Sequence, residues 1–237
     1  MGTAHDHIVK SYDLELARLT EEIVRMGEMA ASQLTGAMDV LERRDSRAAE
    51  RIVGNDVEID RLEHEVSHDV VRLLALRQPM ARDLREILAA LRIASDIERI
   101  GDYASNAAKR SIALNEFPVV AQARGLAAIA HLAAQMLRDV LAAYRTRDAQ
   151  AAIAVRARDA ELDAQYTALF RELLTYMAED PRSISPSIHL MFIAKNIERI
   201  GDHATNIAEN IWFVVNGEAP LAEREKRDLT SAVGRSG

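Results

Sequence analysis

The amino-acid sequence predicts an all-α protein built as two tandem antiparallel three-helix bundles that are related by internal duplication. The hexapeptide Ile-Glu-Arg-Ile-Gly-Asp occupies residues 97–102 and returns unchanged at residues 197–202, and such self-similarity indicates an internal repeat. Apolar residues recur with helical spacing in every long segment. Apolar residues make up 49% of the 237 residues but aromatic residues only 4%, a mix that favours close-packed helices over a β-sandwich.

Three long helices with short connections predict the first antiparallel bundle. Asp45 is the expected N-cap of its second helix, and Pro79 and Pro118 end its second and third helices. The hexapeptide lies in the third helix. We assign this bundle to residues 1–117 and its helices to about residues 8–43, 46–76 and 82–114.

The same succession of elements then restarts. Asp148 is the expected N-cap of the second helix, while Ser185 is the expected N-cap of the third helix and Pro186 its first residue. The charged tail, residues 218–237, is predicted to be mobile. We assign the second bundle to residues 118–217 and its helices to about residues 122–145, 149–178 and 186–216.

The hexapeptide places two acidic residues four positions apart in each copy, Glu98 with Asp102 and Glu198 with Asp202. Residues at this spacing lie one turn apart on the same helix face. Like charges there repel by a few tenths of a kcal/mol. Because both copies carry this penalty, we infer that the carboxylates bind something, and a hard divalent or trivalent cation is the obvious candidate.

Each second helix carries a further acidic pair at the same spacing, within an Asp-x-Glu-x-Asp run. In an antiparallel hairpin these pairs either face the acids of the third helix or face water, and the sequence leaves both arrangements open. Gly101 and Gly201 lie at the edge of the acidic face, where a missing side chain lets another helix come close.

Two other interpretations of the hexapeptide acids remain open. In the first, the acids belong to a solvated polar face in which Arg99–Asp102 and Arg199–Asp202 form ion pairs along the helix. In the second, the bundle is a metal-free scaffold whose acidic stripes dock on a basic surface of a partner protein.

Composition excludes several classes of function. The net charge of −7 argues against a nucleic-acid partner. The absence of cysteine excludes disulfides and thiolate zinc sites. No apolar run approaches the length of a membrane span, and the N-terminus lacks the layout of a signal peptide. We therefore expect a cytoplasmic protein that does not insert into the membrane.

Residues 64–68 spell His-Glu-x-x-His, the zinc-binding motif of a class of peptidases. The second copy has no counterpart, and the sequence offers no third ligand, so surface histidines are the preferred interpretation. A ferritin-like di-iron enzyme requires Glu-x-x-His on two helices, and here only Glu65 and His68 match. These two metal-dependent enzymes are the alternatives to the prediction that the protein is not an enzyme.

The acid-x-x-x-Asp pattern followed by Ala-x-Asn in both copies, together with the Asp-x-Glu-x-Asp runs, resembles the signature of the PhoU family over nearly the whole chain up to Gly217. The resemblance implies a non-enzymatic role that damps phosphate uptake and keeps the phosphate-starvation response repressed when phosphate is plentiful. It implies two partners, the ATPase subunit of the phosphate ABC transporter and a membrane sensor histidine kinase. We also expect a homodimer.

The resemblance further implies multinuclear metal sites that contain iron, zinc, manganese or magnesium. Glu209 matches the family's Asn-Ile-Ala-Glu ending on the acidic face of the second copy, but the first copy has Lys109 there. A lysine repels a cation, so we expect the first site to be the weaker one. Carried over residue by residue, the metal ligands are Glu98, Asp102, Glu198 and Asp202, with Asp56, Asp60, Asp159 and Asp163 as secondary candidates.

Overall fold

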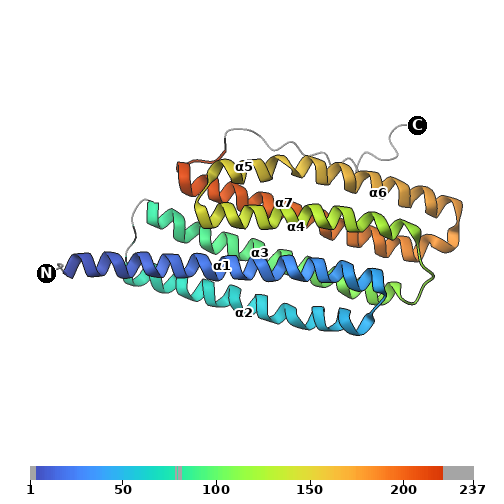
Figure 1. Ribbon diagram of the computed structural model, residues 1–237, viewed down its shortest axis with the longest axis horizontal. Coiled ribbons are helices and arrows are strands. Elements are labelled where there is room, and N and C mark those ends of the chain that lie inside the picture. The colour runs from blue at the N-terminus through green and yellow to red at the C-terminus, as the bar shows by residue number, and fades with distance from the viewer. Residues whose placement is uncertain (1–3, 78, 80–81, 221–237) are drawn as a thin grey trace.

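The computed structural model describes residues 4–77, 79 and 82–220. Over this part of the chain it contains seven α-helices and no β-strand, which confirms the predicted all-α class (Figure 1). Residues 221–237 of the expected mobile tail lie outside the described residues. The helices are α1 (Ala4–Arg43), α2 (Ser46–Arg77), α3 (Arg82–Leu114), α4 (Arg124–Thr146), α5 (Ala149–Ala157), α6 (Asp159–Glu179) and α7 (Ile184–Asn216), with short 3-10 turns η1 (Ala121–Ala123) and η2 (Pro181–Ser183).

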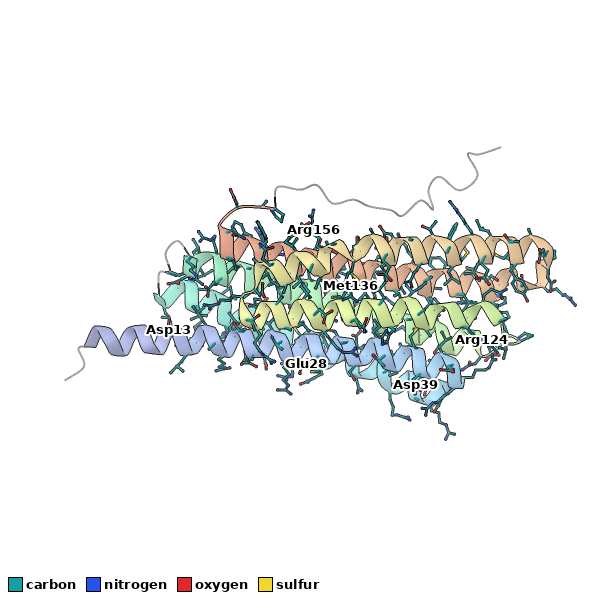
Figure 2. The ribbon with its side chains drawn as sticks, turned by 45° about the horizontal axis from the view of Figure 1, so that its top comes forward. Asp13, Glu28, Asp39, Arg124, Met136 and Arg156 are labelled. Atoms are coloured by element: carbon teal, nitrogen blue, oxygen red, sulfur yellow. The ribbon has the colours of Figure 1, made fainter. Side chains whose placement is uncertain are left out.

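The helices form two bundles that pack side by side along their lengths. Helices α1, α2 and α3 make the first bundle, and α4, α5 with α6, and α7 make the second (Figure 1). Helix α3 packs along α7, and α1 packs along α4, while α2 and α5–α6 lie on opposite outer sides. The buried apolar side chains of both bundles belong to one continuous cluster. Exposed acids such as Glu28 and Asp39 stand on α1 outside this core (Figure 2).

The first turn of each bundle shows the duplication in its backbone. Arg44 and Arg147 both adopt the left-handed conformation, with φ of 57° and 56°. Each is followed by an aspartate that caps the next helix. Asp45 accepts from the backbone N–H of Ala48 at 3.0 Å, and Asp148 accepts from two N–H groups of α5. The predicted N-caps Asp45 and Asp148 are therefore confirmed.

The single helix predicted over residues 149–178 is wrong, because it is broken in two at Arg158. The backbone N–H of Arg158 bonds to the carbonyl of Val155, three residues back rather than four. Its side chain leaves the helix to bond to Asp139 at 2.6 Å and to Gln135 at 3.2 Å, both on α4. The break makes Asp159 the first residue of a new helix.

The predicted start of the last helix at Ser185 and Pro186 is also wrong, because α7 begins at Ile184. Asp180 caps the preceding 3-10 turn, which begins at Pro181. The Ser183 hydroxyl lies 2.6 Å from the carbonyl of Asp180, to which it donates, and does not cap α7. The polar groups of the turn therefore form hydrogen bonds with one another, and α7 starts earlier than the capping pattern predicts.

Helix α4 corrects the expectation that no segment is long and apolar enough to cross a membrane. The stretch Ala121–Thr146 passes that test by length and composition, with 61% of its most apolar part buried inside the protein. Its apolar side chains, among them Leu126, Met136 and Leu137, pack in the shared core against α1 and α7. Burial within the protein accounts for the composition of this helix.

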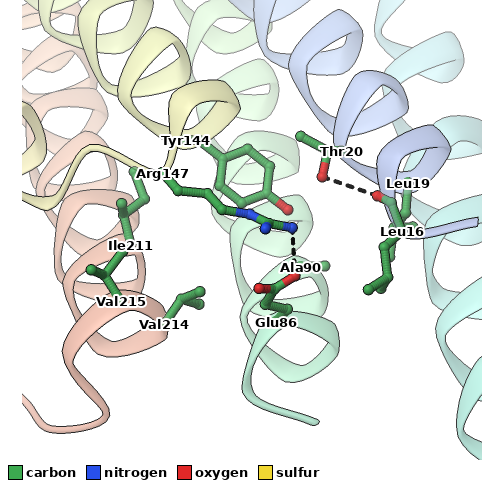
Figure 3. Close-up of a pocket in the computed structure, with 10 residues that line it drawn as sticks. All are labelled: Leu16, Leu19, Thr20, Glu86, Ala90, Tyr144, Arg147, Ile211, Val214 and Val215. Carbon is green, nitrogen blue, oxygen red and sulfur yellow. Dashed lines mark hydrogen bonds and ion pairs between the residues drawn. The ribbon is translucent and has the colours of Figure 1, made fainter. Parts of the chain in front are cut away.

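Polar contacts join the two bundles at their long interface. Arg147 of the second bundle pairs with Glu86 of α3 at 2.7 Å (Figure 3). Tyr144 lies beside this pair, and its burial raises the pKa of the phenol to about 12. Further along, Asp96 of α3 accepts from His203 at 2.8 Å. Because these contacts connect helices from both repeats, they stabilise the bundles as one unit.

Candidate functional site

The glycine of each hexapeptide lets the second and third helices of its repeat come into close contact. A Cβ atom placed on Gly101 would lie 2.9 Å from Cδ1 of Ile59 and 3.3 Å from Oδ1 of Asp56. A Cβ atom placed on Gly201 would collide with the Leu162 side chain and lie 3.4 Å from Oδ1 of Asp159. Ile59 and Asp56 occupy the repeat positions of Leu162 and Asp159, so the duplication extends to side-chain contacts. The predicted close approach at both glycines is confirmed.

The acids of α2 and α3 are neighbours at this contact. The pKa of the Asp60 carboxyl is raised, first by burial and then by the charges of Asp56 and Asp102. The pKa of Glu98 is also raised, first by burial and then by Asp102, with smaller contributions from Asp60 and Glu63. These five residues form what we call the first acidic cluster. In this repeat the two acidic pairs lie near enough for the charges on α2 and α3 to affect each other, so they do not stand apart in water.

Neighbouring polar groups support part of the first acidic cluster. The side-chain amide of Gln33, on α1, donates to Asp56 at 3.0 Å. Arg99 lies 3.4 Å from Asp102 and 3.6 Å from Glu98, and 58% of its side chain is exposed. The ion pair predicted along the helix at Arg99 is therefore confirmed, but it lies on the solvent side and does not reach Asp60, whose raised pKa is opposed only by His64.

The corresponding second acidic cluster consists of Asp159, Asp163, Glu198 and Asp202, on α6 and α7. It is more deeply buried, since Asp159 and Asp163 are each 2% exposed and Glu198 is 3% exposed. Lys195 brings an ammonium group to this cluster, with its Nζ 2.9 Å from Oε2 of Glu198.

Glu209, expected to extend the second acidic face, has a cationic partner. Its carboxylate lies 2.9 Å from Nε of Arg156, on α5, whose side chain is only 11% exposed. Lys109, at the matching position of the first repeat, is exposed. Arg199, which follows Glu198 on α7, donates to the hydroxyl of Tyr103 at 3.2 Å, across the interface between the repeats.

The chemistry of the donors differs between the two clusters. Over the ranges that the structure describes, no group of three His, Cys, Asp or Glu side chains is arranged to hold a metal ion. The first acidic cluster offers five carboxylates, with the Gln33 amide beside them, and oxygen donors of this kind are the ones that hard cations prefer. In the second acidic cluster the ammonium of Lys195 already contacts a candidate ligand, so this cluster as it stands does not fit a metal ion.

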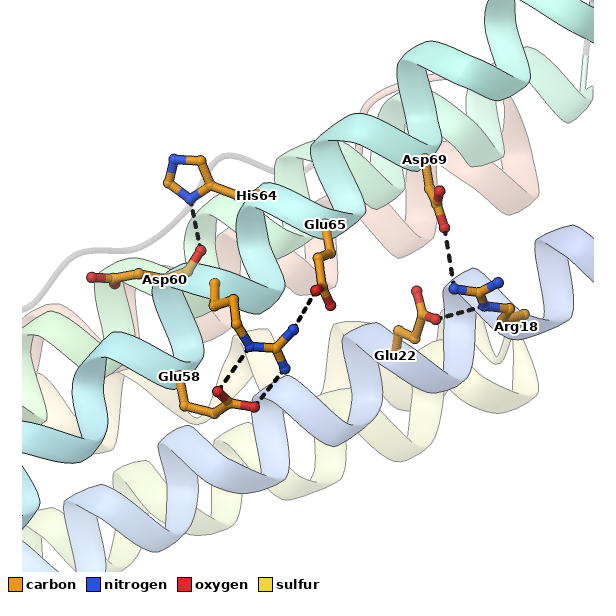
Figure 4. Close-up of polar contacts among 8 residues, drawn as sticks. Arg18, Glu22, Glu58, Asp60, His64, Glu65 and Asp69 are labelled. Atoms are coloured by element: carbon orange, nitrogen blue, oxygen red, sulfur yellow. Dashed lines mark hydrogen bonds and ion pairs between the residues drawn. The ribbon is translucent and has the colours of Figure 1, made fainter.

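The His-Glu-x-x-His segment shows no zinc-site geometry. His64 and His68 are exposed on α2, and Nδ1 of His64 donates to the backbone carbonyl of Asp60 at 2.7 Å (Figure 4). Glu65, the base in the peptidase interpretation, is ion-paired with Arg61. Surface histidines therefore account for the motif, as the sequence favoured.

Three residues at the acidic clusters could not be found from the repeated hexapeptide or its acidic partners. Gln33 and Glu63 contribute to the first acidic cluster, while their repeat counterparts are Met136 and Tyr166. Lys195 contributes to the second, and its counterpart is Ser95. Because none of the three is duplicated, the comparison of repeats that identified the acids gives no signal for them.

A family model described as "PhoU domain" matches the chain twice, at residues 23–111 and 126–211. Similar curated proteins include the phosphate-specific transport system accessory protein PhoU homolog of Xylella fastidiosa (strain 9a5c), which is 64% identical over 98% of this chain and 99% of that protein. The homolog of the same name from Rhizobium meliloti is 47% identical over 98% of both chains.

Solved structures agree with this assignment. The crystal structure of PhoU from Pseudomonas aeruginosa matches with a TM-score of 0.84 and 36% identity, and covers 87% of this chain and 100% of that chain. The phosphate transport system regulatory protein PhoU from Streptococcus pneumoniae matches with a TM-score of 0.83 and 29% identity, over 89% of this chain and 100% of that chain. The resemblance found in the doubled hexapeptide is thus confirmed over both repeats, and the chain belongs to the PhoU family.

Proposed function

We propose that this protein is a cytoplasmic regulatory adaptor of phosphate homeostasis, which limits phosphate uptake and represses the phosphate-starvation response. The support is twofold. The PhoU family is a family of non-enzymatic regulatory and accessory proteins, and the similar curated proteins carry the name of accessory proteins of phosphate-specific transport. The fold also agrees with a role through contact, because the exposed residues along the outer side of α2 are mostly polar, and those along α5–α6 are a mixture of polar residues and alanines.

The proposed partners are the ATPase subunit of the phosphate ABC transporter and a membrane sensor histidine kinase. A homodimer is the proposed assembly. Two outer faces, on α2 and on α5–α6, lie on opposite sides of the molecule. A molecule of this shape can contact two partners at once, so the adaptor would link the state of the transporter to that of the kinase.

The cation part of the proposal is supported by the first acidic cluster, in which the partly buried acids of α2 and α3 are close enough for their charges to affect each other. Asp56, Asp60, Glu98 and Asp102 would hold the ion, and all four supply carboxylate oxygens. Among iron, zinc, manganese and magnesium, such ligands suit magnesium and manganese best. The bound cation would offset the repulsion between the acids and fix α2 against α3, which shapes the outer face for docking.

The competing interpretation is that the same acids dock directly on a basic surface of a partner, without a metal. The Arg99 side chain, which already pairs with Glu98 and Asp102 from the solvent side, shows that a guanidinium can reach these carboxylates. Both interpretations need the acids, and only the cation interpretation needs metal for the protein to recognise its partners.

Affinity-tagged protein purified from phosphate-replete cells tests the proposed contacts. The ATPase subunit or the kinase should be recovered with the wild-type protein, and a chelator should reduce that recovery. A variant with Asp60→Asn and Glu98→Gln should recover less of the partner than a variant with Glu28→Gln and Asp39→Asn, which changes two exposed acids of α1. If neither partner is recovered from extracts in which the transporter remains assembled, the adaptor role is contradicted.

A further inference from the structure

We propose that Lys195 is the resident cation of the second acidic cluster, so that metal binding is confined to the first repeat. This inference rests on the proposed cation role of the acidic clusters and states which of the two binds a metal ion. It reverses the sequence-based expectation that Lys109 makes the first site the weaker one. Lys109 is exposed, whereas Lys195 contacts a buried carboxylate.

The two repeats share one antiparallel register, and this makes their residues comparable one by one. Gly101 lies against Asp56 and Ile59, as Gly201 lies against Asp159 and Leu162. One turn further along the helices, this register pairs position 98 with position 60 and position 198 with position 163. The next turn pairs position 95 with position 63 and position 195 with position 166.

At this last step the two repeats differ in charge. The Nζ atom of Lys195 lies 2.9 Å from Oε2 of Glu198 and 5.1 Å from the centre of the Tyr166 ring. The ring is 4% exposed, and its face attracts the ammonium. The first repeat has Ser95, which is exposed, and the acidic Glu63 at the matching positions. The second repeat therefore has an ammonium and an aromatic ring at these two positions. The first repeat has a hydroxyl and a further carboxylate there.

Burial explains why the second acidic cluster needs a cation at all times. Asp159, Asp163 and Glu198 are at most 3% exposed, and carboxylates removed from water need compensating positive charge. Lys195 supplies a full charge. The break at Arg158 adds the positive end of α6, since Asp159 is the first residue of that helix. A metal ion entering this cluster would have to displace the ammonium and overcome its repulsion.

The first acidic cluster is less buried than the second and, among the residues that the structure describes, has no buried cation beside it. Its carboxylates are only partly buried, in contrast to Asp159, Asp163 and Glu198. Arg99 approaches from the solvent side with a mostly exposed side chain. A cation arriving from solvent therefore competes only with this exposed guanidinium, which can swing away into water, and no buried ion pair has to break first.

Exchanging the two repeats' residues at these positions tests the proposal. Purified full-length protein is freed of metal with a chelator, and Mn²⁺ uptake is measured by dialysis and electron paramagnetic resonance. The wild type should take up Mn²⁺, and changing Asp56 and Asp60 to asparagine should abolish the uptake. Changing Asp159 and Asp163 to asparagine should leave it intact.

The Glu63→Tyr/Ser95→Lys variant transplants the lysine and its ring into the first repeat, and it should lose uptake. Lys195→Ser should gain uptake in the second repeat. Without metal, Lys195→Ser should also lower the thermal midpoint by roughly 10 °C because it removes the ammonium that lies 2.9 Å from the buried Glu198 carboxylate, and Mn²⁺ should restore the midpoint.

The outcomes separate this proposal from the proposed function. If the wild type takes up Mn²⁺ and loses it only when Asp159 and Asp163 are changed, the cation role stands and the lysine proposal is overturned. If the wild type takes up no Mn²⁺, the cation role of the first repeat fails. Lys195→Ser then decides the lysine proposal, since a gain of uptake supports it and no gain overturns it. If Lys195→Ser does not fold without metal, unchanged uptake by Glu63→Tyr/Ser95→Lys overturns the proposal and lost uptake supports it.

Discussion

Changing Asp60 to asparagine and Glu98 to glutamine should abolish the stabilisation that Mn²⁺ gives to the wild-type protein. A ligand present at a hundred times its dissociation constant stabilises a protein by about 2.7 kcal/mol. If the first acidic cluster holds the cation, this gain disappears once the two carboxylates become amides. Thermal or urea unfolding with and without Mn²⁺ measures the difference.

The same variant should be slightly more stable than the wild type when metal is absent. Both carboxyls have pKa values raised in the folded protein, so their charged forms disfavour folding at neutral pH. The gain should be about 0.5–1 kcal/mol, since these groups are partly solvated and each like-charge contact costs only a few tenths of a kcal/mol. It should vanish as the pH falls below the pKa of the unfolded carboxyls, where both states are protonated.

A matched control carries glutamine at Glu28 and Glu50, two exposed acids outside the cluster. It makes the same change in net charge and should keep the full response to Mn²⁺. An unchanged Mn²⁺ response in the Asp60→Asn/Glu98→Gln variant would place the cation elsewhere, and equal loss in both variants would indicate nonspecific charge binding.

Gly201→Ala should lower the free energy of unfolding by about 1–3 kcal/mol, the range for overpacking a well-packed core. The new methyl group would collide with Leu162, a side chain that is 0% exposed and so has little room to move. Gly101→Ala should cost less, because its Cβ would lie 2.9 Å from the end of the Ile59 side chain. Urea unfolding at neutral pH gives both values.

Gly54→Ala is the matched control, because Gly54 is in the interior of α2 and a Cβ there would have no atom within 4 Å. This change should stabilise the protein by about 0.5–1 kcal/mol through helix propensity. A second check combines Gly201→Ala with Leu162→Ala, which should show coupling between the two positions. If Gly201→Ala is as stable as the wild type, the helices do not depend on this close approach.

The sequence predicted the helices well because each long helix carries its own apolar period, and the Asp45 and Asp148 caps are local signals. It failed at Arg158 because the break there depends on Asp139 and Gln135 of another helix. It failed at the start of α7 because Ser183 bonds to the preceding turn. Both failures come from interactions that the local pattern does not contain.

The candidate site was predicted in part for a similar reason. The hexapeptides and their acidic partners stood out because they are duplicated. Whether the acidic pairs face each other depends on the rotation of two helices about their axes, which only packing determines. Lys195 and Glu63 break the duplication, so the difference in charge between the repeats appears only when the helices are placed side by side.

The proposed role in phosphate control is tested most directly by a phosphate-starvation reporter in cells that lack this gene, grown in phosphate-rich medium. We expect the reporter to be strongly expressed in the deletion strain and to be repressed again by the wild-type gene supplied in trans. A reporter that stays repressed in the deletion strain, at the level of the parent strain, would contradict the proposed role in phosphate control.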